Sequence, residues 1–194
     1  MSADPSSKTK LLLAAKKLFA EHGFEGTSVR QICEEAGVNL ALVSYHFGGK
    51  ENVFYAIFEH YFPLSKLDML DDDVLNPVQR LRMLITQTLL FFHDEPELQR
   101  IMDREFAGLS PRAEALTKFT FPVWRKLRAI LDDGRRGGEF QFESLDYALL
   151  LVISALVFPS KPTLLYKLNT EGPRSIEQTI DLTWQFIYGG LRTH

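Results

Sequence analysis

The sequence has a single cysteine, Cys33, so no disulfide can form within the chain and a cysteine-rich metal site is excluded. Such sparing use of cysteine fits a reducing compartment. An excess of charge of one sign is also missing, because 22 Lys and Arg face 25 Asp and Glu. Up to residue 66 the two kinds of charge are equal in number. Net charge therefore does not by itself indicate a nucleic-acid partner.

Long hydrophobic runs are missing as well. The longest apolar run, Tyr147 to Phe158, is interrupted only by Ser154 and is shorter than the roughly 20 residues of a membrane-spanning helix. The apolar stretch near the start, Leu11 to Ala15, is short and is followed at once by two lysines, unlike a signal peptide. With 45% hydrophobic and 24% charged residues, the composition is globular. We expect a soluble, cytoplasmic protein without a membrane partner.

Apolar residues instead recur with the 3.6-residue period of an α-helix along most of the 194 residues. Glycine, proline and capping residues divide this pattern and predict an all-α fold of about nine helices. The expected helices run from after Ser7 to Gly23, 28–36, 40–46, 50–62, 77–94, 96–109, 111–133, 144–158 and 175–188. The acidic stretch 68–73, the glycines 134, 137 and 138, and the segment 159–173 are expected to form loops, and Pro122 is expected to break its helix.

The second expected helix carries a clear start signal and a narrow apolar stripe. Ser28 and Gln31 have the spacing of a capping box, in which the two residues satisfy each other's backbone N–H groups. Val29, Ile32, Cys33 and Ala36 then follow at helical spacing, so they share one face. We therefore expect Cys33 to be buried in a core rather than to act as a reactive thiol.

The second and third helices are joined by only three residues, Gly37-Val38-Asn39, which is typical of a helix-turn-helix motif. Residues 38, 42, 43 and 47 are apolar and should face inward. The opposite face carries two large apolar groups, Leu40 and Tyr45, which need a partner. Thymine methyl groups and a sugar-phosphate edge would provide one. Packing of Leu40 and Tyr45 on a neighbouring helix is the alternative.

The segment from Gly37 to Glu51, GVNLALVSYHFGGKE, resembles the signature of TetR-family transcriptional regulators. The residues 14–19, Gly23-Phe24 and 27–32 are similar to the first two helices of the same family, so the resemblance covers roughly residues 8 to 62. It implies a DNA-binding domain over residues 6–66, with the helix-turn-helix at about 29–48, and an effector-binding and dimerisation domain over 67–194. It also implies a homodimer on a palindromic double-stranded operator, released by a small-molecule effector.

The resemblance implies phosphate contacts at both edges of this motif. Thr27 and Ser28 would bind phosphate through the N-terminus of their helix, where backbone N–H groups point outward. Arg30 would reach a phosphate or a guanine, with a solvated charge as the alternative. Lys50 would add its charge at a phosphate beside the start of the fourth helix.

The third helix would supply the remaining contacts. The side chains facing base edges would be Asn39, Leu40, Ala41 and Ser44, and those bracing the DNA backbone would be Tyr45 and His46. Many family members have a tyrosine where this sequence has Ser44, with the adjacent aromatic kept here as Tyr45. Which residue reads which base is therefore left open.

The resemblance also gives the last two long helices, 144–158 and 175–188, a role in dimerisation. The first is apolar almost all round, which suits burial against a second copy, or else a central helix within one subunit. The effector site would use an aromatic and methionine cluster with some inward-turned charge: Phe91, Met102, Arg104, Glu105, Phe106, Phe121 and Trp124. Plain core packing is the alternative for this cluster. We expect an apolar or amphipathic effector.

Two other classes of protein fit the sequence less well. An enzyme would need a site such as His93-Asp94-Glu95 with Asp103, but that run ends a helix before Pro96, where polar residues are expected anyway. No phosphate-binding loop, nucleophile motif or metal-ligand spacing is present, so we expect no catalysis, cofactor or metal. A helical protein-interaction module that does not bind DNA remains the other alternative, because the charge is balanced.

Overall fold

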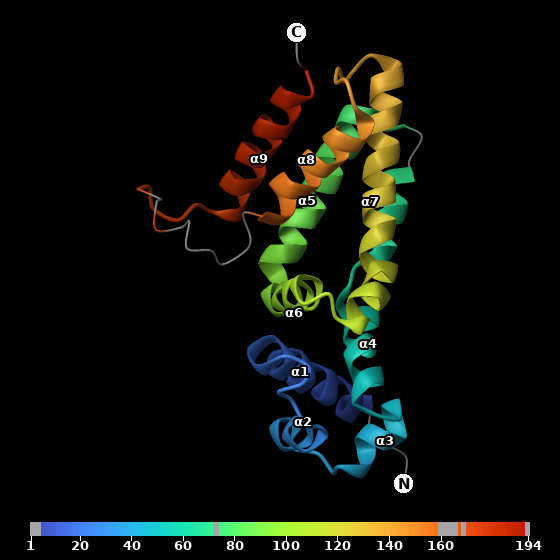
Figure 1. The fold of residues 1–194 in the computed structure, drawn as a ribbon, viewed down its shortest axis with the longest axis vertical. Coiled ribbons are helices and arrows are strands. Elements are labelled where there is room, and N and C mark those ends of the chain that lie inside the picture. The colour runs from blue at the N-terminus through green and yellow to red at the C-terminus, as the bar shows by residue number, and fades with distance from the viewer. Residues whose placement is uncertain (1–4, 72–73, 159–166, 168–169, 193–194) are drawn as a thin grey trace. The chain divides into compact units, whose positions relative to one another are not determined.

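The computed structural model describes residues 5–71, 74–158, 167 and 170–192, and these residues form an all-α fold (Figure 1). The α-helices are α1 (Pro5–His22), α2 (Val29–Ala36), α3 (Ala41–Phe47), α4 (Lys50–Tyr61), α5 (Pro77–Asp94), α6 (Pro96–Ala107), α7 (Pro111–Gly137), α8 (Leu145–Val157) and α9 (Ile176–Gly190). An isolated parallel bridge between Gln141 and Arg192 is the β pairing found among the described residues. No helix in the described ranges is long and apolar enough to span a membrane.

The chain divides into two compact units whose boundary crosses the sequence more than once. The first unit contains the residues up to Phe62 together with Glu95–Leu116, and the second contains Pro63–Asp94 with the residues from Thr117 onward. Helix α6 and the first residues of α7 therefore belong with α1 to α4.

The first unit is built around α1, which packs against α2, α3, α4 and α6. Its apolar residues at helical spacing are buried, including Leu11, Ala15 and Phe19. The Phe19 ring lies 5.6 Å from that of Phe54 on α4, in an edge-on arrangement. Gly23 ends α1 with a φ of 76°, a left-handed conformation that glycine adopts without strain.

The helix-turn-helix forms because both its ends and its turn are locally satisfied. Ser28 caps α2, and the reciprocal bonds of the capping box with Gln31 are both present, as the spacing predicts. Gly37 has a φ of 64° and turns the chain sharply, while its N–H and that of Val38 donate to carbonyls of the last turn of α2. Cys33 is buried in the stripe predicted for it, and this burial raises the pKa of its thiol.

Helix α6 is attached to α1 by polar contacts. Lys16 lies on α1 with 7% of its side chain exposed, and its ammonium is 2.6 Å from Glu95 Oε2 and 3.3 Å from Glu97 Oε2. Burial alone would lower the pKa of Lys16, but the hydrogen bonds and charges of the two carboxylates outweigh it and hold the pKa above its usual value. Further along α6, Arg104 donates to the backbone carbonyl of Glu21.

The second unit has an apolar core between α5, α7, α8 and α9. Its largest fully buried side chains include Leu81, Leu84 and Ile85 of α5 and Phe140 of the loop after α7. Ser144 and Ser175 cap α8 and α9 through their hydroxyls, which fixes where these helices begin.

Several details of the predicted helix boundaries are wrong. Gly134 and Gly137 lie inside α7 rather than in a loop. Gly134 is there for close packing, because a Cβ at this position would lie 2.2 Å from Cδ2 of Phe140. Pro122 also lies inside α7 and does not end it, since proline removes only one of the many N–H bonds of a 27-residue helix.

Two other predicted loops differ in their outcome. Residues Leu64–Asp71 form a 3₁₀ helix, so the described part of the expected loop at 68–73 is helical, and residues 72–73 lie outside the described residues. Most of the segment 159–173, expected to be an irregular crossover, lies outside the described residues.

Candidate nucleic-acid interface

The outward face of α3 is exposed as its sequence predicts. Val43 and Phe47 are buried, whereas Asn39, Ala41 and Ser44 are exposed. Leu40 and Tyr45 have 54% and 69% of their surface accessible. The alternative that these two side chains pack on a neighbouring helix does not hold for the helices that the structure describes, and the start and outward face of α3 expose two large apolar groups.

Both ends of α3 are held in place. Asn39 Oδ1 accepts a hydrogen bond of 2.9 Å from the N–H of Ala41, which closes a side-chain turn just before the helix, whose N-cap position is Leu40. At the other end the ring of His46 is hydrogen-bonded through Nε2 to Ser7 Oγ, at 3.0 Å, on α1. A short, rigid helix with its exposed side fixed in this way is suited to reading base edges in a major groove.

Three predicted contact residues lie at the start of α2, and only some of them face outward. Ser28 is exposed and engaged in the capping box. Thr27 is 2% exposed, and its hydroxyl donates to the carbonyls of Leu18 and Gly23. The side chain of Thr27 therefore shapes the turn. Its own N–H donates to the Phe24 carbonyl at 3.3 Å, so any phosphate contact at this helix start falls to the backbone N–H groups of the residues that follow Thr27. Arg30 is largely exposed and pairs with Glu34 one turn away.

The side chain of Lys50 points toward the turn between α1 and α2 rather than away from the protein. Its ammonium donates to the backbone carbonyls of Phe24 and Thr27, both at 2.9 Å, and lies 4.1 Å from the centroid of the Phe24 ring. The ammonium has three donors, so one remains for another acceptor. Lys50 thus fixes the turn between α1 and α2 beside the start of α4.

Lys8 was not among the residues predicted to contact DNA. It is exposed on α1, with its ammonium 5.8 Å from the centroid of the Phe47 ring at the C-terminal end of α3. Only the packing of α1 against α3 shows this proximity, because 39 positions separate the two residues. A cation at this edge of α3 adds positive charge beside the exposed face.

The residues predicted for the effector site are divided between the two units. Met102, Arg104, Glu105 and Phe106 lie on α6 in the first unit, whereas Phe91, Phe121 and Trp124 lie on α5 and α7 in the second. Glu105 is 4% exposed and accepts hydrogen bonds from Ser110 and Arg112. The two charged members of the set are thus already bonded within the first unit, while Trp124 packs against the core of the second.

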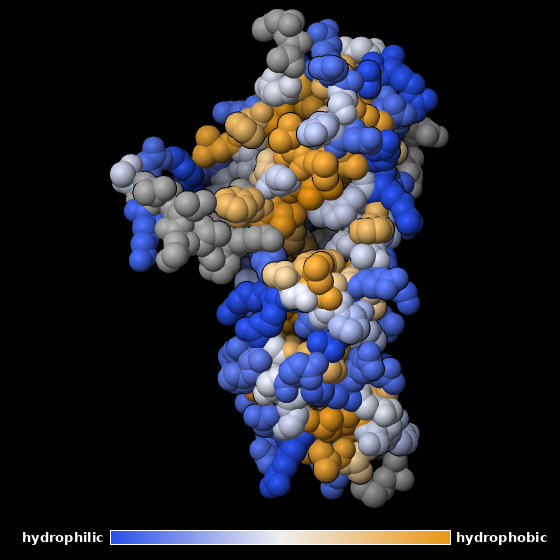
Figure 2. All heavy atoms as spheres, viewed as in Figure 1, coloured by the Kyte–Doolittle hydropathy of each residue, from blue (hydrophilic) through white to orange (hydrophobic). Residues whose placement is uncertain are grey.

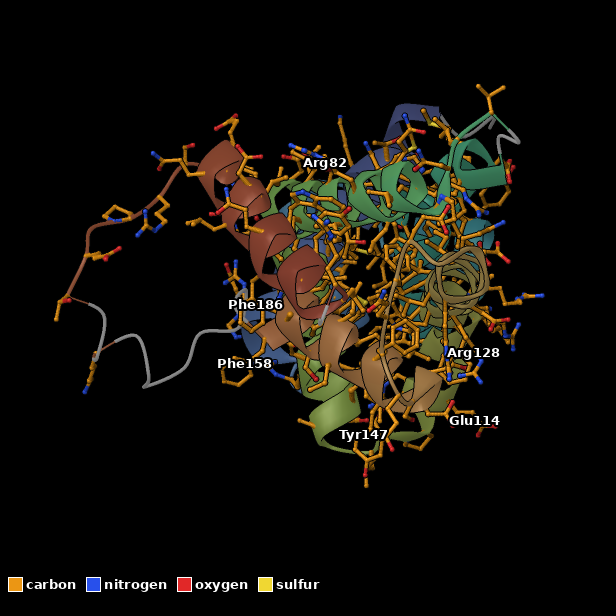
Figure 3. All side chains as sticks on the ribbon, turned by 90° about the horizontal axis from the view of Figure 1, so that it is seen from above. Arg82, Glu114, Arg128, Tyr147, Phe158 and Phe186 are labelled. Atoms are coloured by element: carbon orange, nitrogen blue, oxygen red, sulfur yellow. The ribbon has the colours of Figure 1, made fainter. Side chains whose placement is uncertain are left out.

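The second unit exposes an apolar face on α8 and α9 (Figure 2). A cavity of about 850 Å³ lies between these helices, and its lining includes Leu151, Val152 and Ile187. The rings of Tyr147 and Phe186 point away from the helices that carry them (Figure 3), with 71% and 77% of their surfaces exposed. A face of this size and composition is unusual for a lone subunit. Among the residues that the structure describes, α8 is therefore not surrounded on all sides.

Two family models match the sequence and together cover most of it. One is described as bacterial regulatory proteins of the tetR family and matches residues 11–57. The other is described as the tetracyclin repressor-like C-terminal domain and matches residues 74–191. The second match includes α6 and the start of α7, which the fold joins to the first unit.

Known proteins similar to this chain over most of their length are regulators of transcription. The probable regulator YttP of Bacillus subtilis is 28% identical over 79% of this chain and 77% of its own length. The repressor NicS of Pseudomonas putida is 29% identical, over 78% and 74% respectively. Among solved structures, the hemolysin II transcriptional regulator HlyIIR superimposes with a TM-score of 0.76 at 30% identity, covering 97% of this chain and 98% of its own.

Proposed function

Because this chain belongs to the TetR family of DNA-binding transcriptional regulators, which are not enzymes, we propose that it acts in the cytoplasm as a homodimeric repressor of a palindromic operator. The observation that carries the DNA-binding surface is the exposed face of α3. The residues proposed to contact DNA are Ser28, Arg30, Asn39, Leu40, Ala41, Ser44, Tyr45 and His46, with Lys50 through its remaining donor, whereas Thr27 is proposed to position the start of α2.

The proposed homodimer rests on the apolar face of α8 and α9. Burying Tyr147, Leu151 and Phe186 against a second copy would remove three exposed apolar side chains per subunit from water. A two-fold axis would pair the same face of both subunits. It would also place two α3 helices on one face of DNA, about 34–36 Å apart or a little more.

We propose that a small apolar or amphipathic effector binds the 67–194 domain and releases the operator. Phe91, Phe121 and Trp124 of the second unit are the proposed site residues that we retain, because Arg104 and Glu105 already have partners in the first unit. A coupling of about 1–3 kcal/mol between the two sites changes operator affinity roughly 5- to 150-fold, and DNA must weaken effector binding by the same factor.

The test of the DNA-binding proposal is selection of duplexes from a random-sequence library by the full-length protein at a stated salt concentration. We expect enrichment of an inverted repeat. Ser44→Ala should change the base preferred at one position of each half-site without changing thermal stability, since Ser44 is exposed on α3. Ser65→Ala, at an exposed serine of the 3₁₀ helix Leu64–Asp71, outside both proposed interfaces, is the matched control and should select the wild-type sequence. Failure of the wild type to enrich any sequence would favour the interaction-module alternative.

A further inference from the structure

Arg112, at the start of α7, is surrounded by partners although its sequence context gives it no role. Only 13% of its side chain is exposed. Its Nε donates to Glu105 Oε2 at 3.0 Å, and Nη2 lies 3.2 Å from Glu25 Oε1. The guanidinium carbon lies 3.9 Å from the centroid of the Phe24 ring. A cation with two carboxylates and an aromatic face is a fixed structural element rather than a solvated charge.

The Phe24 ring receives a second cation, from α4. The ammonium of Lys50 lies 4.1 Å from the same centroid and donates to the carbonyls of Phe24 and Thr27. The turn between α1 and α2 is therefore held by one cation from α4 and one from α7. The next residue, Ser28, caps α2 and begins the helix-turn-helix. Movement of Phe24 would displace both the N-terminus of α2 and the ammonium of Lys50.

The connection between α6 and α7 is built to place Arg112. Leu109 has a φ of 46°, a left-handed backbone conformation that residues other than glycine rarely adopt. Glu105 accepts a hydrogen bond from the Ser110 hydroxyl, which in turn accepts one from the N–H of Ala113. Glu105 thus bonds both the residue that caps α7 and Arg112 itself, although it is 4% exposed.

We propose that Arg112 is a positioning residue for DNA binding: through Phe24 and Glu25 it fixes the α1–α2 turn, and with it the N-terminus of α2 and Lys50, in the geometry that contacts the phosphate backbone. This inference rests on the proposed DNA-binding function. It assigns to the DNA-binding unit a residue that the C-terminal family model covers. Lysine is a poor substitute at this site, because a single ammonium lacks the planar fork that stacks on Phe24 while pairing with two carboxylates.

The experiment compares wild type, Arg112→Ala and Arg112→Lys in the full-length protein. Affinity is measured by anisotropy on a duplex that the wild type selects from a random library, and backbone amide exchange is measured across the chain. We expect Arg112→Ala to weaken binding about tenfold or more and to raise exchange at residues 23–31, but not in α8. Arg112→Lys should recover less than half of the lost free energy of binding.

Arg128→Ala is the matched control, because Arg128 lies on the same helix (Figure 3) and pairs at 2.5 Å with Asp146 in the second unit. It should bind DNA within about twofold of wild type, as expected for an exposed ion pair. The proposal is overturned if Arg112→Ala binds within twofold of wild type. It is also overturned if exchange rises equally throughout the chain, or if Arg112→Lys restores binding fully.

A second arm separates this proposal from the proposed function. If the wild type selects no DNA sequence, the proposed function fails, yet exchange at residues 23–31 still tests whether Arg112 fixes the turn. Phe24→Leu keeps apolar volume but removes the aromatic face. If Arg112 acts through this ring, adding Arg112→Ala to Phe24→Leu should raise exchange at the turn by much less than Arg112→Ala does alone. Fully additive effects would contradict the role of Phe24.

Discussion

Each of the two compact units is held together internally by a different kind of contact. In the first, charged side chains with little exposure tie α6 and the start of α7 to the helices of the DNA-binding motif, as with Lys16 and Arg112. In the second, apolar packing dominates, and α8 and α9 keep an uncovered apolar face. The first unit also exposes single apolar side chains away from the outward face of α3, such as Leu13 and Leu109. The second unit, by contrast, gathers exposed apolar side chains on α8 and α9, the face proposed to bind a second copy.

The largest effect is expected from a charge introduced on the apolar face of α8 and α9. Leu151→Glu places a carboxylate at a residue with 67% exposure on α8, where a second copy would bury it twice across a two-fold axis. We expect the dimer to dissociate on the order of 100-fold more readily, and operator affinity to fall with it. Analytical ultracentrifugation over a micromolar range measures the first effect.

Leu13→Glu is the control for this experiment. Leu13 lies on α1 in the first unit and is 56% exposed, so the same substitution is made at a similar exposure. It should leave the sedimentation of the protein unchanged. A Leu151→Glu protein that still sediments as a dimer would show that α8 is not the dimer face.

Close packing in the second unit gives the next largest effect. Gly134→Ala adds a Cβ that would lie 2.2 Å from the Phe140 ring, so Phe140 must move within a filled core. Alanine favours the helix by about 1 kcal/mol, but overpacking costs about 1–3 kcal/mol, and we expect net destabilisation in urea. The added methyl should be better tolerated in a Phe140→Leu background. Gly172→Ala, where the new Cβ meets no atom of the described residues within 4 Å, should change stability little.

The contribution of the Lys16 ion pairs to the stability of the first unit can be tested by varying the pH. Lys16→Met keeps most of the side-chain volume but removes the ammonium that pairs with Glu95 and Glu97, and it should cost about 1–3 kcal/mol at neutral pH. Because folding raises the pKa of Lys16 above 10.5, its contribution is complete below pH 10.5 and is lost as the pH rises through the folded pKa. Urea unfolding at pH 7, 9 and 11 should show the gap between wild type and variant closing only at the highest pH.

The smallest expected effect concerns Lys8, whose ammonium lies beside Phe47 at the C-terminal end of α3. If Lys8 reaches a phosphate, Lys8→Ala should reduce the slope of log affinity against log salt by about 1 per half-site and leave sequence preference unchanged. Lys17→Ala is the control, because Lys17 lies on the same helix as Lys8, α1, but pairs with Glu35 of α2. Equal slopes for Lys8→Ala and wild type would remove Lys8 from the interface.

Features that depend on neighbours in sequence were predictable. The capping box of Ser28 and Gln31, the turn at Gly37 and the exposed face bearing Leu40 and Tyr45 follow from spacing within one or two turns of helix. The order and type of the helices follow in the same way, because period and stop signals are local. The structure confirms each of these expectations.

Features that depend on long-range packing were not predictable. The sequence predicts a phosphate contact for Lys50, but it does not show that the ammonium also bonds carbonyls 23 and 26 residues away. The sequence predicts Gly134 in a loop, since nothing nearby in sequence shows that a Phe140 ring must fit against it. The contacts of Arg112 are not visible in the sequence, because its partners come from α6 and from the α1–α2 turn.

Residues 95–116 follow a segment of the second unit in the sequence but belong to the first unit in the fold. This arrangement affects how the regulator could be re-engineered. Chimeric sensors are made by fusing the DNA-binding segment of one regulator to the effector domain of another, and the apparent joint lies near residue 66. A joint there would separate Lys16 from Glu95, and Phe24 from Arg112, and would confront both with foreign side chains. A chimera that retains its native 95–116 segment, grafted as a second insertion, should preserve operator recognition where a single-joint fusion loses it.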